Sequence, residues 1–161
     1  MTIGPSPPDV VVALDNDVLN DWRFRKPATL VAISNYISQL KAPPALTSIT
    51  IFEMMHGFEK AELQAGVVNE LLRRDREHAQ RLTRECAVLP FNQEAAEIAA
   101  YIFPRLSQKE RNRLWTDVFI AATALAHDYG IATRNRSDFE LIAQYIPSDR
   151  PPLRIEVWKS R

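Results

Sequence analysis

Cysteine and glycine are both scarce in this sequence, and each shortage argues against a class of function. With one cysteine, Cys86, among 161 residues, the chain cannot form an intramolecular disulfide, and it lacks the cysteine and histidine spacing of a zinc site. Cys86 lies in an apolar run, so we expect it to be a small buried packing residue. The four glycines form neither a glycine-rich phosphate loop nor a dinucleotide-binding fingerprint, which argues against a nucleotide cofactor.

Excess charge of either sign and long apolar runs are also missing. Lys and Arg number 20, as do Asp and Glu, so no overall field attracts nucleic acid, and any nucleic-acid site has to be a local patch. No apolar run reaches the length of a membrane span, and the N-terminus lacks the basic and apolar regions of a signal peptide. We therefore expect a cytoplasmic protein without membrane contact, in which the single cysteine stays reduced.

The composition is that of one globular domain, with 46% hydrophobic and 25% charged residues. Prolines in residues 1–8 predict a flexible N-terminal tail, which leaves a single domain at 9–161. Short apolar runs predict five strands, and segments with helical spacing lie between them. The predicted strands are 9–14, 45–49, 86–91, 131–133 and 153–158. Strands that alternate with helices indicate an α/β fold, a three-layer α/β/α sandwich with a mainly parallel five-stranded sheet.

The stretch 115–139 contains the strongest structural pattern. Residues 118–126 are apolar with one exception, which predicts a buried helix that is too short to cross a membrane. We expect Asp117 to head this helix after a charged linker at 107–113. We expect Gly130 to end it with a positive φ angle.

Acidic residues recur where the strands of the predicted sheet end. The carboxyl ends of parallel strands lie at one edge, where open α/β sheets bind ligands. We expect four acids to meet at this edge, with Asp17 as a possible fifth: Asp15, Glu53, Asp117 and Asp138. Two carboxylates about 5 Å apart repel by roughly 3 kcal/mol at an effective dielectric constant near 20. Protons or a cation must therefore lie among them.

The type of ligand atom narrows the choice of cation. Oxygen ligands without cysteine favour Mg²⁺ or Mn²⁺. Such an ion activates water and stabilises charge on a phosphoryl group. The chemistry predicted for this edge of the sheet is therefore phosphodiester hydrolysis.

Three segments together resemble one protein family. The first is Asp-Val-Phe-Ile-Ala-Ala-Thr-Ala-Leu-Ala at 117–126, followed by Thr-Arg-Asn-Arg-Ser-Asp-Phe at 133–139. The second is Leu-Asp-Asn-Asp-Val-Leu at 14–19, and the third is Ser-Ile-Thr-Ile-Phe-Glu at 48–53 with Gly57 four residues on. From residue 10 to 158 the chain resembles the PIN-domain ribonucleases, and among them the VapC-like toxins of toxin–antitoxin pairs.

This resemblance implies a function and a set of site residues. It implies that four acids hold one or two divalent ions, Mg²⁺ or Mn²⁺, and activate water that cuts RNA: Asp15, Glu53, Asp117 and Asp138. The neighbouring groups that can orient these ligands are Asn16, Asp17 and Thr133. Where the family usually has Asp-Thr-Asn or Asp-Ser-Asn, this chain has Asp-Asn-Asp at 15–17. Similar proteins form homodimers, and each has a cognate antitoxin protein that blocks the acidic pocket.

Basic residues near the predicted site have two interpretations. Arg134 and Arg136 flank the pocket in sequence and are candidates for contact with RNA phosphates. Arg113 belongs to a charged cluster just before Asp117. This cluster is either a solvated linker or a phosphate track that leads to the acids.

Each acid also has a purely structural interpretation. Thr50 and Glu53 have the spacing of a capping box, and Asp15, Asp117 and Asp138 can each cap or begin a helix. Four such acids predicted at one edge are harder to explain as separate caps, so we favour a shared site.

Two other functions compete with the ribonuclease. The Asp15-x-Asp17 pattern after an apolar strand resembles the start of haloacid-dehalogenase-like phosphatases, in which the first aspartate is the nucleophile. The lysine and the later aspartate pair of those enzymes are not evident in the sequence. The altered Asp-Asn-Asp triplet leaves a third possibility, a PIN-like module that binds RNA or protein without catalysis.

Overall fold

The computed structural model describes residues 11–67 and 69–158, so the predicted tail at 1–8 lies outside the described residues. Five parallel strands form one sheet in the order β3-β2-β1-β4-β5. The strands are β1 Val12–Leu14, β2 Ala45–Thr47, β3 Val88–Leu89, β4 Gly130–Thr133 and β5 Ile155–Val157. The sequence predicted all five, and the last lies at an edge as expected. β2 is shorter than the predicted 45–49 because α3 already begins at Ser48.

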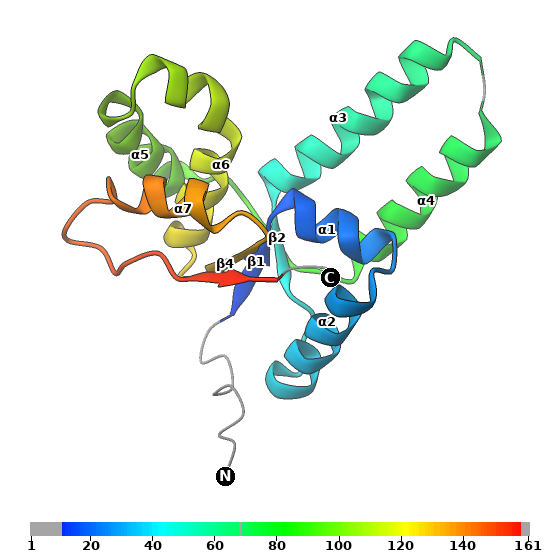
Figure 1. Cartoon of the computed structure of the whole chain (residues 1–161), viewed down its shortest axis with the longest axis horizontal. Helices are drawn as coiled ribbons and strands as arrows, with labels where there is room; N and C mark the ends of the chain where they lie inside the picture. The colour runs from blue at the N-terminus through cyan, green and yellow to red at the C-terminus, as the bar shows by residue number, and fades with distance from the viewer. Residues whose placement is uncertain (1–10, 68, 159–161) are drawn as a thin grey trace.

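Helices cover both faces of the sheet, which confirms the three-layer α/β/α fold (Figure 1). Their bounds are α1 Asn16–Arg23, α2 Pro27–Leu40, α3 Ser48–Ala65, α4 Glu70–Arg84, α5 Gln93–Ile102, α6 Gln108–Ala126 and α7 Arg136–Ala143, with a 3-10 turn η1 at Phe103–Arg105. Successive residues of the strands pack into two hydrophobic cores, one on each face of the sheet. Ala13 and Ile131 face the layer of α5, α6 and α7, whereas Leu14 and Ala132 face the layer of α1 to α4.

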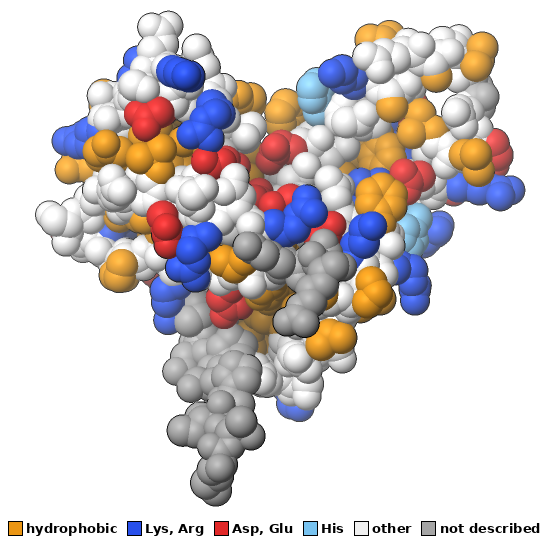
Figure 2. All heavy atoms as spheres, in the orientation of Figure 1, with side chains coloured by type: hydrophobic (Ala, Val, Ile, Leu, Met, Phe, Trp, Pro, Cys, Tyr) orange, Lys and Arg blue, Asp and Glu red, His pale blue; other side chains and the backbone are white. Residues whose placement is uncertain are grey.

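The α3–α4 hairpin extends beyond the sheet as an arm, and a notch separates this arm from the lobe built by α5, α6 and α7 (Figures 1 and 2). Cys86 is buried at the base of α4, as predicted. Among the described residues, no helix is both long enough and apolar enough to cross a membrane.

The start of α6 differs from the prediction. Residues 107–113 were expected to be a linker, but 108–113 form the first turns of this helix. The reason is a capping box: Ser107 Oγ accepts a hydrogen bond from the Glu110 amide (3.1 Å), and the Glu110 carboxylate accepts one from the Ser107 amide (2.8 Å). Asp117 therefore lies in the middle of α6 and does not head it.

The turn between α6 and β4 also differs. Gly130 was expected to end the helix with a positive φ, but it is the first residue of β4. Asp128 takes the left-handed conformation instead, with φ of 60°, because a short polar side chain tolerates that region better than most residues do. The amide of Gly130 donates to the carbonyl of Val11 (2.9 Å) and so starts the pairing of β4 with β1.

Substitution by alanine is expected to have opposite effects on stability at two glycines, one inside α3 and one at its C-terminal cap. A Cβ added at either Gly57 or Gly66 meets no heavy atom within 4 Å, but Gly66 has φ of 67° and Gly57 lies inside the helix. Gly57→Ala is therefore expected to raise the free energy of unfolding by about 0.5–1 kcal/mol, since alanine loses less entropy in a helix. Gly66→Ala is expected to lower it by about 1 kcal/mol. Urea denaturation measures both, and equal shifts in one direction would contradict this explanation.

Candidate active site

Asp15 lies where β1 ends, and two contacts fix its carboxylate. One oxygen caps α1 by accepting a hydrogen bond from the Asn16 amide (2.8 Å), and the other accepts one from the Thr133 hydroxyl (2.9 Å). Thr133 ends β4, the parallel neighbour of β1, so the sheet register itself brings these residues together. The Asp15 residue is buried, with 8% of its surface exposed. Asp15 is thus an N-cap, as its structural interpretation proposed, and also part of a buried cluster.

Glu53 reaches the same edge from α3. The helix begins earlier than predicted because Thr47 is its N-cap and accepts a hydrogen bond from the Thr50 amide (3.1 Å). The Thr50 hydroxyl donates to the carbonyl of Leu14 (3.2 Å), which holds the first turn of α3 against the end of β1. Glu53 therefore lies in the second turn, and the capping-box interpretation of Glu53 was wrong. Its Oε1 atom is buried without a hydrogen-bond partner among the described residues.

Asp117 and Asp138 come from the opposite layer. Asp117 lies at mid-length in α6, and Asp138 lies in the first turn of α7. The Asp138 carboxylate accepts hydrogen bonds from Arg113 Nη1 (2.6 Å) and from Asn135 Nδ2 (2.6 Å). Arg113 therefore neutralises the charge of Asp138, and Asn135 fixes the orientation of its carboxylate.

The carboxylates influence one another electrostatically. Burial, and after it the repulsion from negative neighbours, together raise the pKa of Asp15, Glu53 and Asp117 to about 7 in each case. These neighbours are Asp17 and Asp117 for Asp15, Asp15 and Asp17 for Glu53, and Glu53, Asp138 and Asp17 for Asp117. Figure 2 shows acidic side chains gathered on the floor of the notch between the arm and the lobe. The mutual effects on pKa place Asp15, Glu53 and Asp117 near one another, with Asp138 near Asp117.

A second group of charged residues lies beside the acids, and it includes Asp21, which the sequence analysis did not identify. The Arg134 amide donates to Asp17 Oδ2 (3.2 Å), and its guanidinium pairs with Asp17 (3.6 Å) and with Asp21 (3.4 Å). Asp21 is only 5% exposed. Its spacing of four from Asp17, which places both on one face of a helix, was the available signal. Burial raises the pKa of Asp17, and its contacts with Arg134 oppose that shift.

The arginines predicted to contact RNA are all engaged with acids. Arg113 pairs with Asp138 (2.6 Å), Arg134 with Asp17 and Asp21, and Arg136 with Glu140 (3.1 Å). Each side chain remains about half exposed. Contact with RNA phosphates stays a prediction for all three.

The acidic cluster fits a hard divalent cation in its chemistry. All its ligand atoms are oxygens, which Mg²⁺ and Mn²⁺ prefer. Two of these oxygens, Glu53 Oε1 and Asp17 Oδ1, are buried and have no partner in the part of the chain that the structure describes. Within 11–67 and 69–158, no three Asp, Glu, His or Cys side chains are grouped closely enough to form a ready-made metal cage. That Asp15, Glu53 and Asp117 would hold an ion, with Asp138 beside them, therefore stays a prediction.

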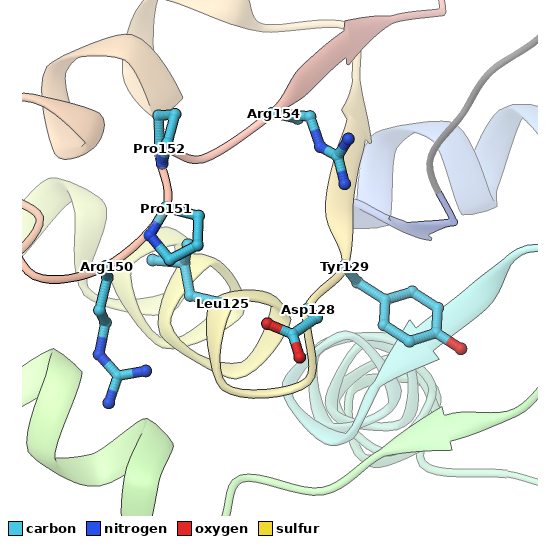
Figure 3. A pocket seen from close by; sticks show the side chains of 7 residues that line it. All are labelled: Leu125, Asp128, Tyr129, Arg150, Pro151, Pro152 and Arg154. Carbon is cyan, nitrogen blue, oxygen red and sulfur yellow. The ribbon is translucent and has the colours of Figure 1, made fainter.

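A cavity of about 370 Å³ lies elsewhere, where α6 leads into β4 (Figure 3). Leu125, Tyr129 and the segment from Arg150 to Arg154 line it, and none of the predicted site residues does. Arg150 is already paired with Glu94 (2.6 Å). Since β4 begins here, this cavity lies at the amino edge of the parallel sheet, away from the acids at the carboxyl edge.

Comparison with known proteins agrees with this geometry. The PIN domain family model matches residues 12–144. No curated protein sequence gives a significant match.

Solved structures show the same fold. A chain of VapBC2 from Rickettsia felis, crystallised with a DNA fragment from the promoter, is 17% identical and superposes with a TM-score of 0.70 over 92% of this chain and 99% of that one. A chain of DNA-bound VapBC from Salmonella typhimurium is 20% identical, with a TM-score of 0.69 over 93% of this chain and 99% of that one. A chain of VapBC-5 from Mycobacterium tuberculosis is 18% identical, with a TM-score of 0.58 over 93% and 98%.

Proposed function

The chain belongs to the PIN-domain family, and from this premise we propose that it is a divalent-metal-dependent endoribonuclease that hydrolyses RNA phosphodiester bonds. One observation carries the proposal. Asp15, Glu53 and Asp117 come from three separate segments of the chain, and the pKa of each is raised by at least one of the others. Family membership makes the haloacid-dehalogenase-like alternative the weaker hypothesis.

Each residue has a distinct part in the proposed mechanism. The chemistry that Mg²⁺ or Mn²⁺ supplies in such a site is activation of water and stabilisation of charge on the phosphoryl group. Asp15 is oriented by the Thr133 hydroxyl and the Asn16 amide, so it offers a fixed oxygen. Glu53 offers a buried oxygen that has no partner among the described residues. Arg113, which is about half exposed, adds a positive charge beside Asp138.

We extend the proposal to partners. The solved structures that resemble this chain include DNA-bound VapBC proteins and a member of the VapBC family of toxin–antitoxin systems, and the fold of this chain matches theirs over nearly its whole length. We therefore propose that the chain is the toxin of such a pair, that it forms a homodimer, and that a cognate antitoxin covers the acidic notch. Its action would then be cytoplasmic, where RNA and antitoxin are made.

Cleavage of RNA by the purified chain tests the enzyme. We expect the protein, at nanomolar to micromolar concentration, to cut a mixture of structured and single-stranded RNA in the presence of Mg²⁺ or Mn²⁺. These concentrations suffice because a rate on the order of one turnover per second is ordinary for enzymes. Excess chelator should stop the reaction, and added Mn²⁺ should restore it. The assay is run at about pH 8, above the raised pKa values of the acids, so that they are charged. If the RNA stays intact with either ion, the result would instead favour a PIN-like module that binds without cutting.

A further inference from the structure

A groove of about 280 Å³ adjoins the acidic site between α1, α3 and α4. Glu53 forms one end of it, and Ala61, two turns further along α3, lines it as well. Its apolar surface comes from Met54, Phe58 and Leu72. The volume corresponds to roughly nine water molecules at about 30 Å³ each, so a flat ring of modest size can enter it.

Arg23 lines this groove and is held in place from several sides. Its Nη1 donates to Asn20 Oδ1 (2.8 Å), and its Nη2 donates to Asp75 Oδ2 (3.2 Å). The guanidinium also lies 4.7 Å from the ring centre of Phe58. Only 9% of the side chain is exposed. An arginine fixed by an amide, a carboxylate and an aromatic ring has lost its rotational freedom, so whatever donor remains is already oriented.

One donor does remain. The Nε of Arg23 is buried and has no hydrogen-bond partner among the residues that the structure describes. Asn16 Oδ1 and Glu53 Oε1, both on residues that line the same groove, are likewise buried without partners there. Buried polar atoms are normally paired, and the groove that these three residues line has room for a ligand. One donor and two acceptors without partners therefore lie in the wall of an otherwise largely apolar groove.

We propose that this groove binds one unpaired nucleobase of the RNA, next to the phosphodiester bond that is cut. This inference rests on the proposed ribonuclease function. The edge of a nucleobase carries hydrogen-bond donors and acceptors side by side, which can match Asn16 Oδ1 and Arg23 Nε. Its face is apolar and polarisable, which suits Phe58, Met54 and Leu72. Because Glu53 belongs to both the groove and the acidic site, a base in the groove lies beside the reacting phosphate.

A base bound in this groove has to be unpaired. A base inside a duplex hides its pairing edge and its faces, whereas a base in a loop or a single strand can turn out into a pocket. Arg23 and Asn16 would then determine which base is preferred on one side of the cut, while the acids determine only that a phosphodiester bond is cut.

A matched pair of substitutions on α3 tests the groove. Ala61→Leu fills it at a position about 12 Å along the helix from Glu53, at 1.5 Å per residue. Ala65→Leu makes the same change one turn later, at an exposed position that does not line the groove. We expect the wild type and Ala65→Leu to cut a randomised single-stranded RNA with at least tenfold preference for one base at one position beside the cut. Ala61→Leu should reduce that preference to less than threefold.

The donor itself is tested by Arg23→Lys, which keeps the charge and removes Nε. We expect the same loss of base preference, and circular dichroism should confirm that each variant is folded. If Arg23→Lys does not fold, Ala61→Leu decides the outcome. Unchanged preference in a folded Ala61→Leu protein would overturn the assignment.

Binding of the four nucleoside 5′-monophosphates, measured by NMR with Mg²⁺ present, separates this inference from the proposed function. The base pocket is supported if the wild type and Ala65→Leu bind one nucleotide at least tenfold more tightly than the others and Ala61→Leu loses this preference. If no RNA is cut in that case, only the nuclease proposal fails. Equal or absent binding of all four overturns the base pocket. The base pocket is also overturned if Ala61→Leu blocks binding of an antitoxin but leaves nucleotide binding unchanged, because the groove would then be a protein-binding site.

Discussion

Asp117→Asn is expected to reduce RNA cleavage by on the order of 10²–10³-fold and to leave the fold intact. The reason is that asparagine has the same shape but no charge, so one ligand and one negative charge leave the site while the packing of α6 stays the same. Metal-assisted stabilisation of a transition state supplies several kcal/mol, and each 1.36 kcal/mol corresponds to a tenfold change in rate. The measurement is the initial rate of cleavage with Mn²⁺, for wild type and variant purified in the same way.

Two comparisons separate a lost ligand from a damaged fold. Asp149→Asn makes the same chemical change at an exposed loop position and should cleave at the wild-type rate. Asp117→Asn should also be at least as stable as the wild type at pH 8 without divalent ions, because Asp117 lies among the negative charges of Glu53 and Asp138. Full activity in Asp117→Asn would remove the acidic cluster from the mechanism.

The fold was predictable where the signal was a continuous run of one kind of residue. Strands were predicted at 9–14 and 45–49, and the structure contains β1 and β2 within these ranges. The start of α6 was missed because the charged residues at 107–113 suggested solvent exposure. The local signal that mattered was Ser107 followed by Glu110, which satisfies two amides whatever the polarity of the residues between them.

The candidate site was predictable for a topological reason. Acids that follow parallel strands lie at one edge, so Asp15 could be placed beside Glu53 without knowing any side-chain conformation. Partners from segments far apart in the sequence were not predictable in this way. The pairing of Arg134 with Asp21 depends on how the loop after β4 meets α1, and that of Arg23 with Asp75 depends on how α1 packs on α4. Single-sequence spacing contains no such information.

Two arginines near the site have a role that sequence proximity alone could not assign. In sequence, Arg113 and Arg134 were candidates for RNA contact because they stand close to the acids. In the structure both neutralise acids of the site, Arg113 at Asp138 and Arg134 at Asp17. The cluster therefore has counter-ions at two of its acids, Asp138 and Asp17. The charge that has no ion pair among the described residues is concentrated on Asp15, Glu53 and Asp117.

That concentration predicts an unusual dependence of stability on pH. The pKa of Asp15, Glu53 and Asp117 is about 7 in the folded chain, against ordinary values of 3.8 for Asp and 4.5 for Glu. The folded state therefore binds more protons than the unfolded state between about pH 4 and pH 7, so stability falls as pH rises through that range. One such group changes the free energy of unfolding by about 1.4 kcal/mol per pH unit. A single group of this kind loses about 2.7 kcal/mol between pH 5 and pH 7. Without divalent ions, we therefore expect the melting temperature to fall by at least roughly 5–10 °C between pH 5 and pH 8.

A divalent cation should reverse this loss at pH 8 and have little effect at pH 5. At pH 8 the three carboxylates are charged and bind the ion, and an ion at 100 times its dissociation constant stabilises the fold by about 2.7 kcal/mol. At pH 5 they carry protons, which compete with the ion. Glu53→Gln should remove much of both effects because it removes one of the repelling charges. Differential scanning calorimetry with chelator or Mn²⁺ measures the four melting temperatures. If they are equal for the wild type, the acids do not share one cation site.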